Sequence, residues 1–175
     1  MNDFLSEMLA VEEGGEKLYA KALEELAHDD LRDKLEEFHE ETQRHIELVR
    51  EMMQSAGIDD SHKSPTAEAA EQKAEGLLSV EVEDHLKDLN NIENLVLAET
   101  KDHWDWEMLN SIAGRIEDAD LKDVVRDALA EVFKQEREHL LWNQQTLTML
   151  ASEAAERQET GEEAEDEEKE SARDY

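Results

Sequence analysis

The sequence predicts an all-α fold in residues 1–152, a four-helix bundle of two helical hairpins joined by a long crossover. Three observations predict it. Apolar residues recur with the spacing of a helix over four long segments. A single Pro and six Gly among 175 residues leave too little turn chemistry for an all-β fold. The breaks within the two hairpins also resemble each other, as Asp30-Leu31-Arg32-Asp33 and Asp120-Leu121-Lys122-Asp123.

Two apolar faces predict the first hairpin. The first helix carries its apolar face over residues 4–26, and the second carries its face over residues 31–56 and ends at Gly57. Asp30 is expected to be the N-cap of the second helix, with Asp33 at its third position, because an aspartate oxygen can accept hydrogen bonds from the free amides of a first turn.

The second hairpin follows a long connection. Residues 57–78 hold the only Pro of the chain and two of its Gly around a short Ala/Glu-rich segment, which is too long for a hairpin turn and indicates the crossover. The helical pattern then resumes over residues 79–116. After a break at 117–120, it continues over residues 121–150.

The charge of the chain excludes several classes of function. It has 49 acidic residues against 18 basic ones, a net charge of −31, so it is repelled by nucleic acids and by anionic lipid. The absence of Cys excludes disulfides, iron–sulfur clusters, thiolate zinc sites and cysteine nucleophiles. The sequence shows neither a membrane span nor a signal peptide, so a soluble, cytoplasmic protein is expected.

The acidic residues are distributed in two ways. Residues 153–175 carry eleven acidic residues against three basic ones and few apolar residues, which predicts a disordered acidic tail. Residues 1–152 keep a net charge of −23 but retain helical periodicity. An ordered core covered with carboxylates is typical of adaptation to molar salt, where the Debye length falls to about 3 Å. We therefore expect a halophilic source.

Several polar residues fall inside the apolar faces, where a carboxylate or an imidazole is costly unless a partner satisfies it. On helical wheels the inward positions near the face centres hold Glu12 on the first helix, Thr42 and His45 on the second, Asp102 on the third, and Glu136 and His139 on the fourth. Glu99 and His103 lie further from the centre of the third helix, and Glu41 lies at the edge of the second.

A bound cation would satisfy several of these groups at once, and their oxygen and nitrogen atoms suit Fe or Mn. Glu136 and His139 have the i, i+3 spacing that places two ligands on one face of a helix. Two other Glu-x-x-His matches, which end at His28 and His39, point away from the apolar faces and are not taken as ligands.

The lengths of the two hairpins favour Glu99 over Asp102 as the ligand of the third helix. Measured from the break of its hairpin, Glu99 lies three residues further than Glu12, and His139 lies four residues further than His45. Each difference is about one helical turn, so the Glu and the His of each hairpin still face each other at one height.

The residues by themselves leave alternatives open. A lone inward histidine is also typical of a hydrogen-bonded core residue, and this applies to His45 and His139. Three residues are candidates as outer ligands or as hydrogen-bond partners of ligands: Glu41, Asp102 and His103. The three tryptophans are expected to be core or groove aromatics: Trp104, Trp106 and Trp142.

On these residues the chain resembles the ferritin-like superfamily, most nearly its rubrerythrin-like branch. The resemblance covers about residues 4–152 and rests on the paired hairpins, on Glu136-Arg137-Glu138-His139 and on the segment 98–107. Together with Glu41-Thr42-Gln43-Arg44-His45, that segment is also similar to uncharacterised ferritin-like proteins of bacteria and haloarchaea.

The resemblance implies one or two Fe or Mn ions that handle O₂, peroxide or iron storage. The ligands that it implies are Glu12, His45, Glu99, Glu136 and His139. Thr42 stands where the family has its first bridging Glu, so the first half of the site lacks one anionic ligand. A rubredoxin-like segment is excluded because it needs Cys. We expect a homo-oligomer with no nucleic-acid or membrane partner.

Two function hypotheses follow. The first is a metal-binding ferritin-like protein that oxidises iron, stores it, or removes peroxide, with no catalytic residue assigned. The second is a metal-free helical bundle that acts as a structural or stress-linked interaction module. A hydrolase or transferase has no support, because the sequence lacks a phosphate loop, a nucleophile elbow and a His-Glu-x-x-His zinc motif.

Overall fold

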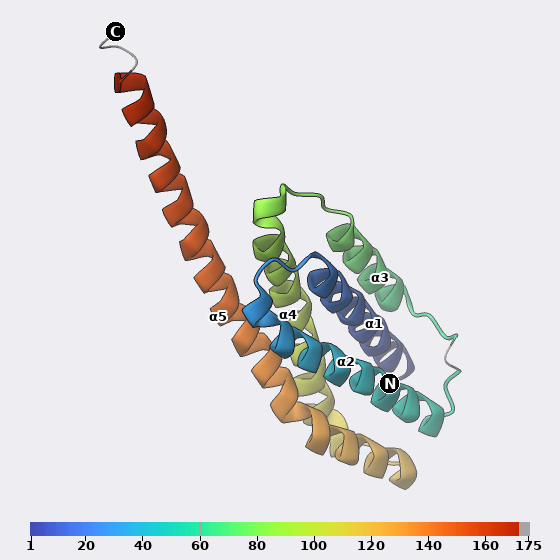
Figure 1. Ribbon diagram of the computed structural model, residues 1–175. Coiled ribbons are helices and arrows are strands. Elements are labelled where there is room, and N and C mark those ends of the chain that lie inside the picture. Colours follow the sequence, from blue (N-terminus) through green and yellow to red (C-terminus); the bar gives the residue numbers. More distant parts are fainter. Residues whose placement is uncertain (60, 172–175) are drawn as a thin grey trace.

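The computed structural model describes residues 1–59 and 61–171, with side chains as far as Arg157. Over these residues it is all-helical, and the helices are α1 (Asn2–Glu25), α2 (Arg32–Ser55), α3 (Pro65–Leu78), α4 (Lys87–Ala113) and α5 (Ala119–Ser171), with short 3₁₀ turns at Asp29–Leu31 and Asp84–Leu86 (Figure 1). The all-α prediction is confirmed. The third predicted helix begins at Lys87 instead of 79. Residues 80–83 are not helical, and the second 3₁₀ turn lies between them and Lys87.

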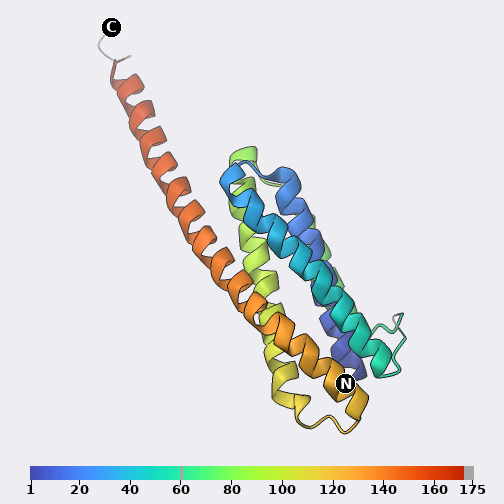
Figure 2. The ribbon, with the colours of Figure 1, turned by 60° about the horizontal axis from the view of Figure 1, so that its bottom comes forward.

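Four long helices enclose the core. α1 packs against α2 and α4, and α5 packs against α4 and α2, while α3 packs mainly against α1 and its last turn reaches α4, where Asn94 donates to the Leu77 carbonyl at 3.5 Å (Figures 1 and 2). The buried apolar side chains form two clusters. One includes Met8, Val49, Leu109 and Val132, and the other includes Leu18, Phe38, Leu95 and Leu150. Along each long helix, the residues between these two clusters are the inward polar ones.

The turn between α1 and α2 is not capped as predicted. Asp30 lies within the 3₁₀ turn, and α2 begins without a side-chain cap. Instead Asp88 of α4 accepts hydrogen bonds from the backbone amides of Ala27 at 3.0 Å and His28 at 2.9 Å. A carboxylate distant in the sequence thus satisfies the free amides of this turn.

The crossover contains a true helix. Ser64 caps α3 by accepting a hydrogen bond from the amide of Ala67 at 3.1 Å, and Pro65 occupies the first turn, where it costs no hydrogen bond. α3 approaches α1 closely at Gly14, since a Cβ atom added there would lie 2.9 Å from the Cβ of Ala74.

We expect Gly14→Ala to lower the free energy of unfolding by about 1 kcal/mol, because overpacking costs about 1–3 kcal/mol and exceeds the helix-propensity gain of about 0.5–1 kcal/mol. Gly76→Ala on α3 is the matched control, since nothing lies within 4 Å of an added Cβ there. That variant should be more stable than the wild type. Urea unfolding of both variants tests the packing of α3, and equal gains in stability would contradict it.

α5 extends well beyond the other helices (Figures 1 and 2). Residues 153–175 were predicted to be a disordered tail, but the backbone is helical as far as Ser171, and residues 172–175 lie outside the described residues. The Ala and Glu of this segment are strong helix formers, so helix propensity explains the continuation without packing. The domain boundary at 152 stays a prediction.

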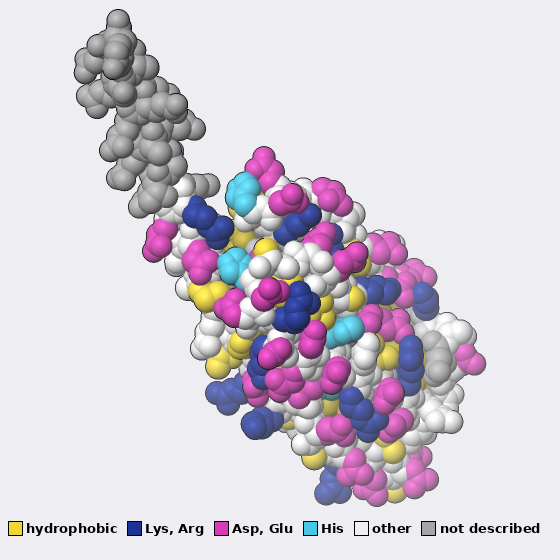
Figure 3. Space-filling view, viewed as in Figure 1, with side chains coloured by type: hydrophobic (Ala, Val, Ile, Leu, Met, Phe, Trp, Pro, Cys, Tyr) yellow, Lys and Arg dark blue, Asp and Glu magenta, His cyan; other side chains and the backbone are white. Residues whose placement is uncertain are grey.

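Acidic side chains cover the described surface. Figure 3 shows the face on which α2 lies, where Asp and Glu side chains are spread over the whole face with Lys and Arg between them. Many of these form exposed ion pairs, such as Arg50–Glu13 at 2.8 Å, which add little stability individually. None of the helices that the structure describes has the length and apolar character needed to cross a membrane.

We expect this excess of carboxylates to make stability depend on salt. From dilute buffer to about 3 M KCl, the melting temperature should rise by about 5–10 °C, or about 2–3 kcal/mol for a chain of this size, because salt screens the like charges. Melting curves across a KCl series measure the effect. A melting temperature that stays flat or falls with salt would show that the surface is not adapted to it.

Candidate metal centre

Six ionisable side chains form a buried layer between the two apolar clusters. None of them is more than 7% exposed, and they come from all four long helices: Glu12, His45, Glu99, Asp102, Glu136 and His139. The structure therefore brings together the five residues predicted as ligands. It adds Asp102, which the hairpin lengths had placed second to Glu99.

The ligand atoms of this layer form two groups. Atoms of Glu12, His45, Asp102 and Glu136 lie within 4.8 Å of one another, and so do atoms of Glu99, Glu136 and His139. Glu136 belongs to both groups. Two neighbouring cation positions with one shared carboxylate therefore fit the arrangement.

Seven atoms of this layer are buried without a hydrogen-bond partner among the described residues. They are Glu12 Oε2, His45 Nδ1, Glu99 Oε2, Asp102 Oδ1, both carboxylate oxygens of Glu136, and His139 Nδ1. His45 Nδ1 lies 3.0 Å from Glu136 Oε1 but without hydrogen-bond geometry. Because each buried, unpaired polar atom costs about 1–3 kcal/mol, so many together indicate a missing common partner.

Glu12 and Glu99 are each held by a hydrogen bond to one carboxylate oxygen. Trp106 Nε1 donates to Glu12 Oε1 at 2.8 Å, and the Tyr19 hydroxyl donates to Glu99 Oε1 at 2.6 Å. Their second oxygens are the unpaired ones. Each glutamate is thus oriented from one side and presents a free oxygen to the centre.

The two histidines are oriented by a chain of hydrogen bonds on their outer side. His45 Nε2 lies 3.1 Å from Gln135 Oε1, Gln135 Nε2 donates to Glu41 Oε1 at 2.7 Å, and His139 Nε2 lies 2.7 Å from Glu41 Oε2. Since Gln135 donates with its amide nitrogen, its oxygen accepts from His45. Glu41, a carboxylate, accepts from His139.

This chain fixes the tautomers of both rings. In the neutral form of each ring, His45 and His139 carry their proton on Nε2, so each can then present the lone pair of Nδ1 to the centre. The alternative of two hydrogen-bonded core histidines accounts for Nε2 of each ring, whereas Nδ1 of each ring has no hydrogen-bond partner among the described residues. Glu41 was among the residues predicted from the sequence as partners of ligands, whereas Gln135 was not, because its role depends on groups on another helix.

The electrostatics of the layer favour cations. Burial raises the pKa of Glu136 to about 7, with His45 opposing and Glu99 adding to the effect. Burial also raises the pKa of Asp102. Burial alone would lower the pKa of His139, but the carboxylates of Glu99 and Glu41 outweigh it and raise this pKa to about 10.

The charges balance if two divalent ions are bound. The four buried carboxylates supply four negative charges and the imidazoles none, so two divalent cations neutralise the layer. The donor set, oxygen atoms with two imidazole nitrogens and no thiolate, suits Fe or Mn. Thr42 of α2 is also buried and carries no charge, and Asp102 is an additional anion in this layer.

The remaining histidines named above lie outside this layer. His28 pairs with Asp88 and Glu153, and His39 lies 3.0 Å from Glu16. His103 is partly exposed, lies 3.9 Å from Glu107, and belongs to neither group of ligand atoms. Excluding the first two Glu-x-x-His matches was therefore correct, and His103 is not brought to the centre.

A family model described as "Domain of unknown function (DUF892)" matches residues 2–131. The chain belongs to the DUF892 family. This family lies in the ferritin-like superfamily, which confirms that part of the resemblance. No curated protein and no solved structure matches the chain.

The DUF892 match covers the helices that carry four of the six residues of the layer. Glu12, His45, Glu99 and Asp102 lie within it, whereas Glu136 and His139 lie beyond its end. Membership of DUF892 supports the fold of this part of the chain, and the assignment of Glu12, His45, Glu99 and Asp102 rests on the geometry of the layer. The shared carboxylate and the second histidine are supported by the geometry of this chain alone.

Proposed function

We propose that this DUF892 protein binds a pair of Fe or Mn ions in the buried layer, within a ferritin-like four-helix bundle. Glu136, which belongs to both groups of ligand atoms, would help to hold both ions. Glu12, His45 and Asp102 serve the first position, and Glu99 and His139 serve the second. The observation that carries the proposal is the set of seven unpaired, inward atoms in two groups that share Glu136.

A bound Fe or Mn pair would supply redox chemistry, and oxidation of Fe(II) or removal of peroxide are the reactions that we infer. The chain itself keeps the centre dry, because an apolar cluster packs on either side of the layer. Gln135 and Glu41 keep both Nδ1 lone pairs directed inward. Glu41, whose side chain is 24% exposed, connects this network with the surface between α2 and α5.

The test is metal binding by untagged protein. After treatment with a chelator, anaerobic titration with Fe(II), and separately with Mn(II), should give two ions per chain by elemental analysis. Subsequent addition of O₂ or peroxide to the Fe(II)-loaded protein then tests the inferred reactions. A chain that binds no ion while keeping its helices would favour the metal-free interaction module instead.

One histidine variant distinguishes the two positions. His139→Ala removes a ligand of the second position only, so metal content should fall from two ions to about one. His39→Ala is the matched control, because His39 pairs with Glu16 away from the layer, and it should still bind two. Equal metal content in both variants would contradict the assignment. The rubrerythrin-like branch and a cytoplasmic location stay predictions.

A further inference from the structure

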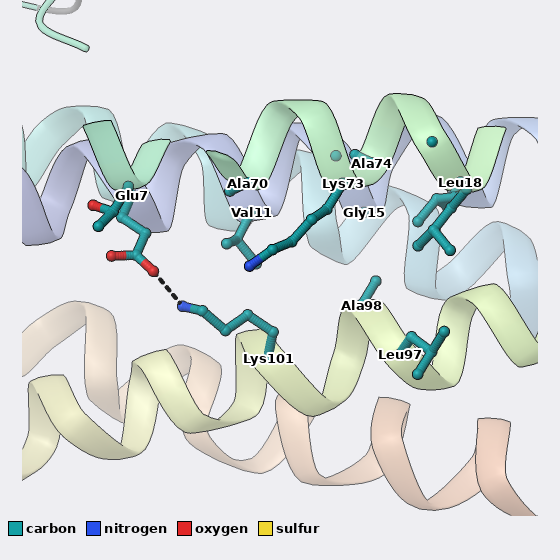
Figure 4. A pocket seen from close by; sticks show the side chains of 14 residues that line it. Glu7, Val11, Gly15, Leu18, Ala70, Lys73, Ala74, Leu97, Ala98 and Lys101 are labelled. Atoms are coloured by element: carbon teal, nitrogen blue, oxygen red, sulfur yellow. Dashed lines mark ion pairs between the residues drawn. The ribbon is translucent and has the colours of Figure 1, made fainter. Parts of the chain in front are cut away.

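A groove with walls of small residues lies between α1, α3 and α4. Its volume of about 400 Å³ falls within the range of about 300–1,000 Å³ that is usual for small-molecule sites. Gly15 of α1, Ala70 of α3 and Ala98 of α4 line it, and their short side chains leave it open (Figure 4). Trp104, which was predicted to be a core or groove aromatic, is 60% exposed and does not line this groove, so that prediction is wrong.

The two ends of the groove differ in polarity. One end lies at Leu18, where the last turn of α3, with Leu77, reaches α4 and closes the groove with apolar side chains. Charged side chains line the other end, among them Glu7 and Lys73 (Figure 4). Glu7 and Leu18 are eleven residues apart on α1, so the two ends are about 16 Å apart. A groove with one apolar end and one charged end is complementary to an elongated amphiphile.

One of the two lysines at the charged end has no ion-pair partner. Lys101 Nζ pairs with Glu7 at 2.9 Å and with Asp105 at 2.5 Å, so its charge is already neutralised. Lys73 forms no ion pair with a described carboxylate, and its side chain extends across the groove towards the charged end (Figure 4). The carboxylate of a ligand would give Lys73 the ion pair that it lacks.

We propose that this groove binds a free, unbranched aliphatic carboxylate of medium chain length. The hydrocarbon chain lies along the small-residue walls with its methyl end towards Leu18, and the carboxylate pairs with Lys73. Burial of the chain supplies most of the affinity, and Lys73 sets the orientation. The closed end limits the length of the chain. The groove shares no residue with the buried layer, so the proposal does not rest on metal binding.

Isothermal titration calorimetry with decanoate tests the proposal. The untagged full chain is titrated in molar KCl, which screens the repulsion between decanoate and the acidic surface, and in chelator, so that no metal ion binds the probe. The wild type should bind one decanoate per chain. Ala70→Trp fills the groove and should raise the dissociation constant at least about 10-fold. Ala69→Trp is the matched control, because Ala69 is exposed on α3 and does not line the groove, and it should bind as the wild type does.

Lys73→Gln tests the head group. It should weaken the binding of decanoate about 3–5-fold, the effect of a partly exposed ion pair, and leave the binding of decanol unchanged. Lys17→Gln is the matched control, because Lys17 is exposed on α1 outside the groove and its loss removes the same charge. It should change the binding of neither probe. Circular dichroism establishes that each variant is folded.

Three results would overturn the proposal: no binding of decanoate by the wild type, equal weakening in Ala70→Trp and Ala69→Trp, or unchanged binding of decanoate in Lys73→Gln. Glu136→Gln, which should bind no metal, should still bind decanoate as the wild type does. Loss of decanoate binding in that variant would place the ligand in the buried layer and would also overturn the proposal. Failure to bind decanoate leaves the metal content unaffected, so the groove and the metal centre are tested separately.

Discussion

Glu136→Gln is expected to abolish metal binding at both positions, while the metal-free protein becomes more stable. Among the residues that the structure describes, Glu136 alone belongs to both groups of ligand atoms, so its loss should affect both ions. Glutamine keeps the volume but removes a fully buried carboxylate, whose pKa near 7 shows that its ionised form is disfavoured. We expect two ions per chain to fall to none, and the free energy of unfolding without metal to rise by about 1–2 kcal/mol.

Elemental analysis after Mn(II) loading, and urea unfolding in chelator at pH 8, measure the two effects. Glu138→Gln is the matched control. It lies two residues further on α5, is exposed and pairs with Lys34 at 2.7 Å, so it should keep two ions and change stability by less than about 0.5 kcal/mol. A Glu136→Gln protein that retains both ions would show that the shared carboxylate does not bridge them.

The metal-free protein should lose stability as pH rises, and the stabilisation by metal should grow over the same range. The folded-state pKa of Glu136, about 7, lies above its ordinary value of 4.5, so the unfolded chain ionises first and stability falls by about 3 kcal/mol between these values. His139, with a pKa raised to about 10, contributes stability that is complete below pH 6.5 and is lost as pH rises towards 10. Both groups act in the same direction.

Metal ions must displace these protons to bind, so the affinity for Mn(II) should increase with pH. Melting temperatures with and without Mn(II), at about pH 5.5, 7 and 8.5, measure the difference. We expect the shift caused by Mn(II) to increase at each step in the wild type and to be absent in Glu136→Gln. A shift that is constant across pH would mean that Mn(II) binds at surface carboxylates and not in the buried layer.

Much of the fold could be predicted from sequence because its cause is local. The apolar spacing that predicted the four long helices is the same spacing that buries residues such as Met8, Val49 and Val132. Where the prediction of the fold was wrong, the cause was also physical. The cap of the first turn comes from Asp88, about 60 residues away, so no pattern around Asp30 could reveal it. A helical wheel could have excluded Trp104 from the core. It lies two residues from Trp106, and residues two apart on a helix point about 160° apart.

The candidate site divides in the same way. A polar residue at the centre of an apolar face is visible in the sequence, and this identified Glu12, His45, Glu136 and His139. For the third predicted helix, the hairpin lengths favoured Glu99 over Asp102, but they could not show that both side chains reach the layer. They are three residues apart on the same face of α4. Which of them lies level with the other ligands depends on the position of α4 along α1 and α5. The structure buries both in the layer.

By itself, the sequence determined that this chain is helical, that it has two related hairpins, and that several carboxylates and histidines face a core that cannot hold them alone, because periodicity and composition act within each helix. Only the tertiary structure decided that their unpaired atoms converge on two positions with Glu136 between them, and that Gln135 and Glu41 orient the imidazoles. These arrangements depend on atoms that lie about 90 residues apart in the chain, and only the packing of α2 against α5 brings them within hydrogen-bonding distance.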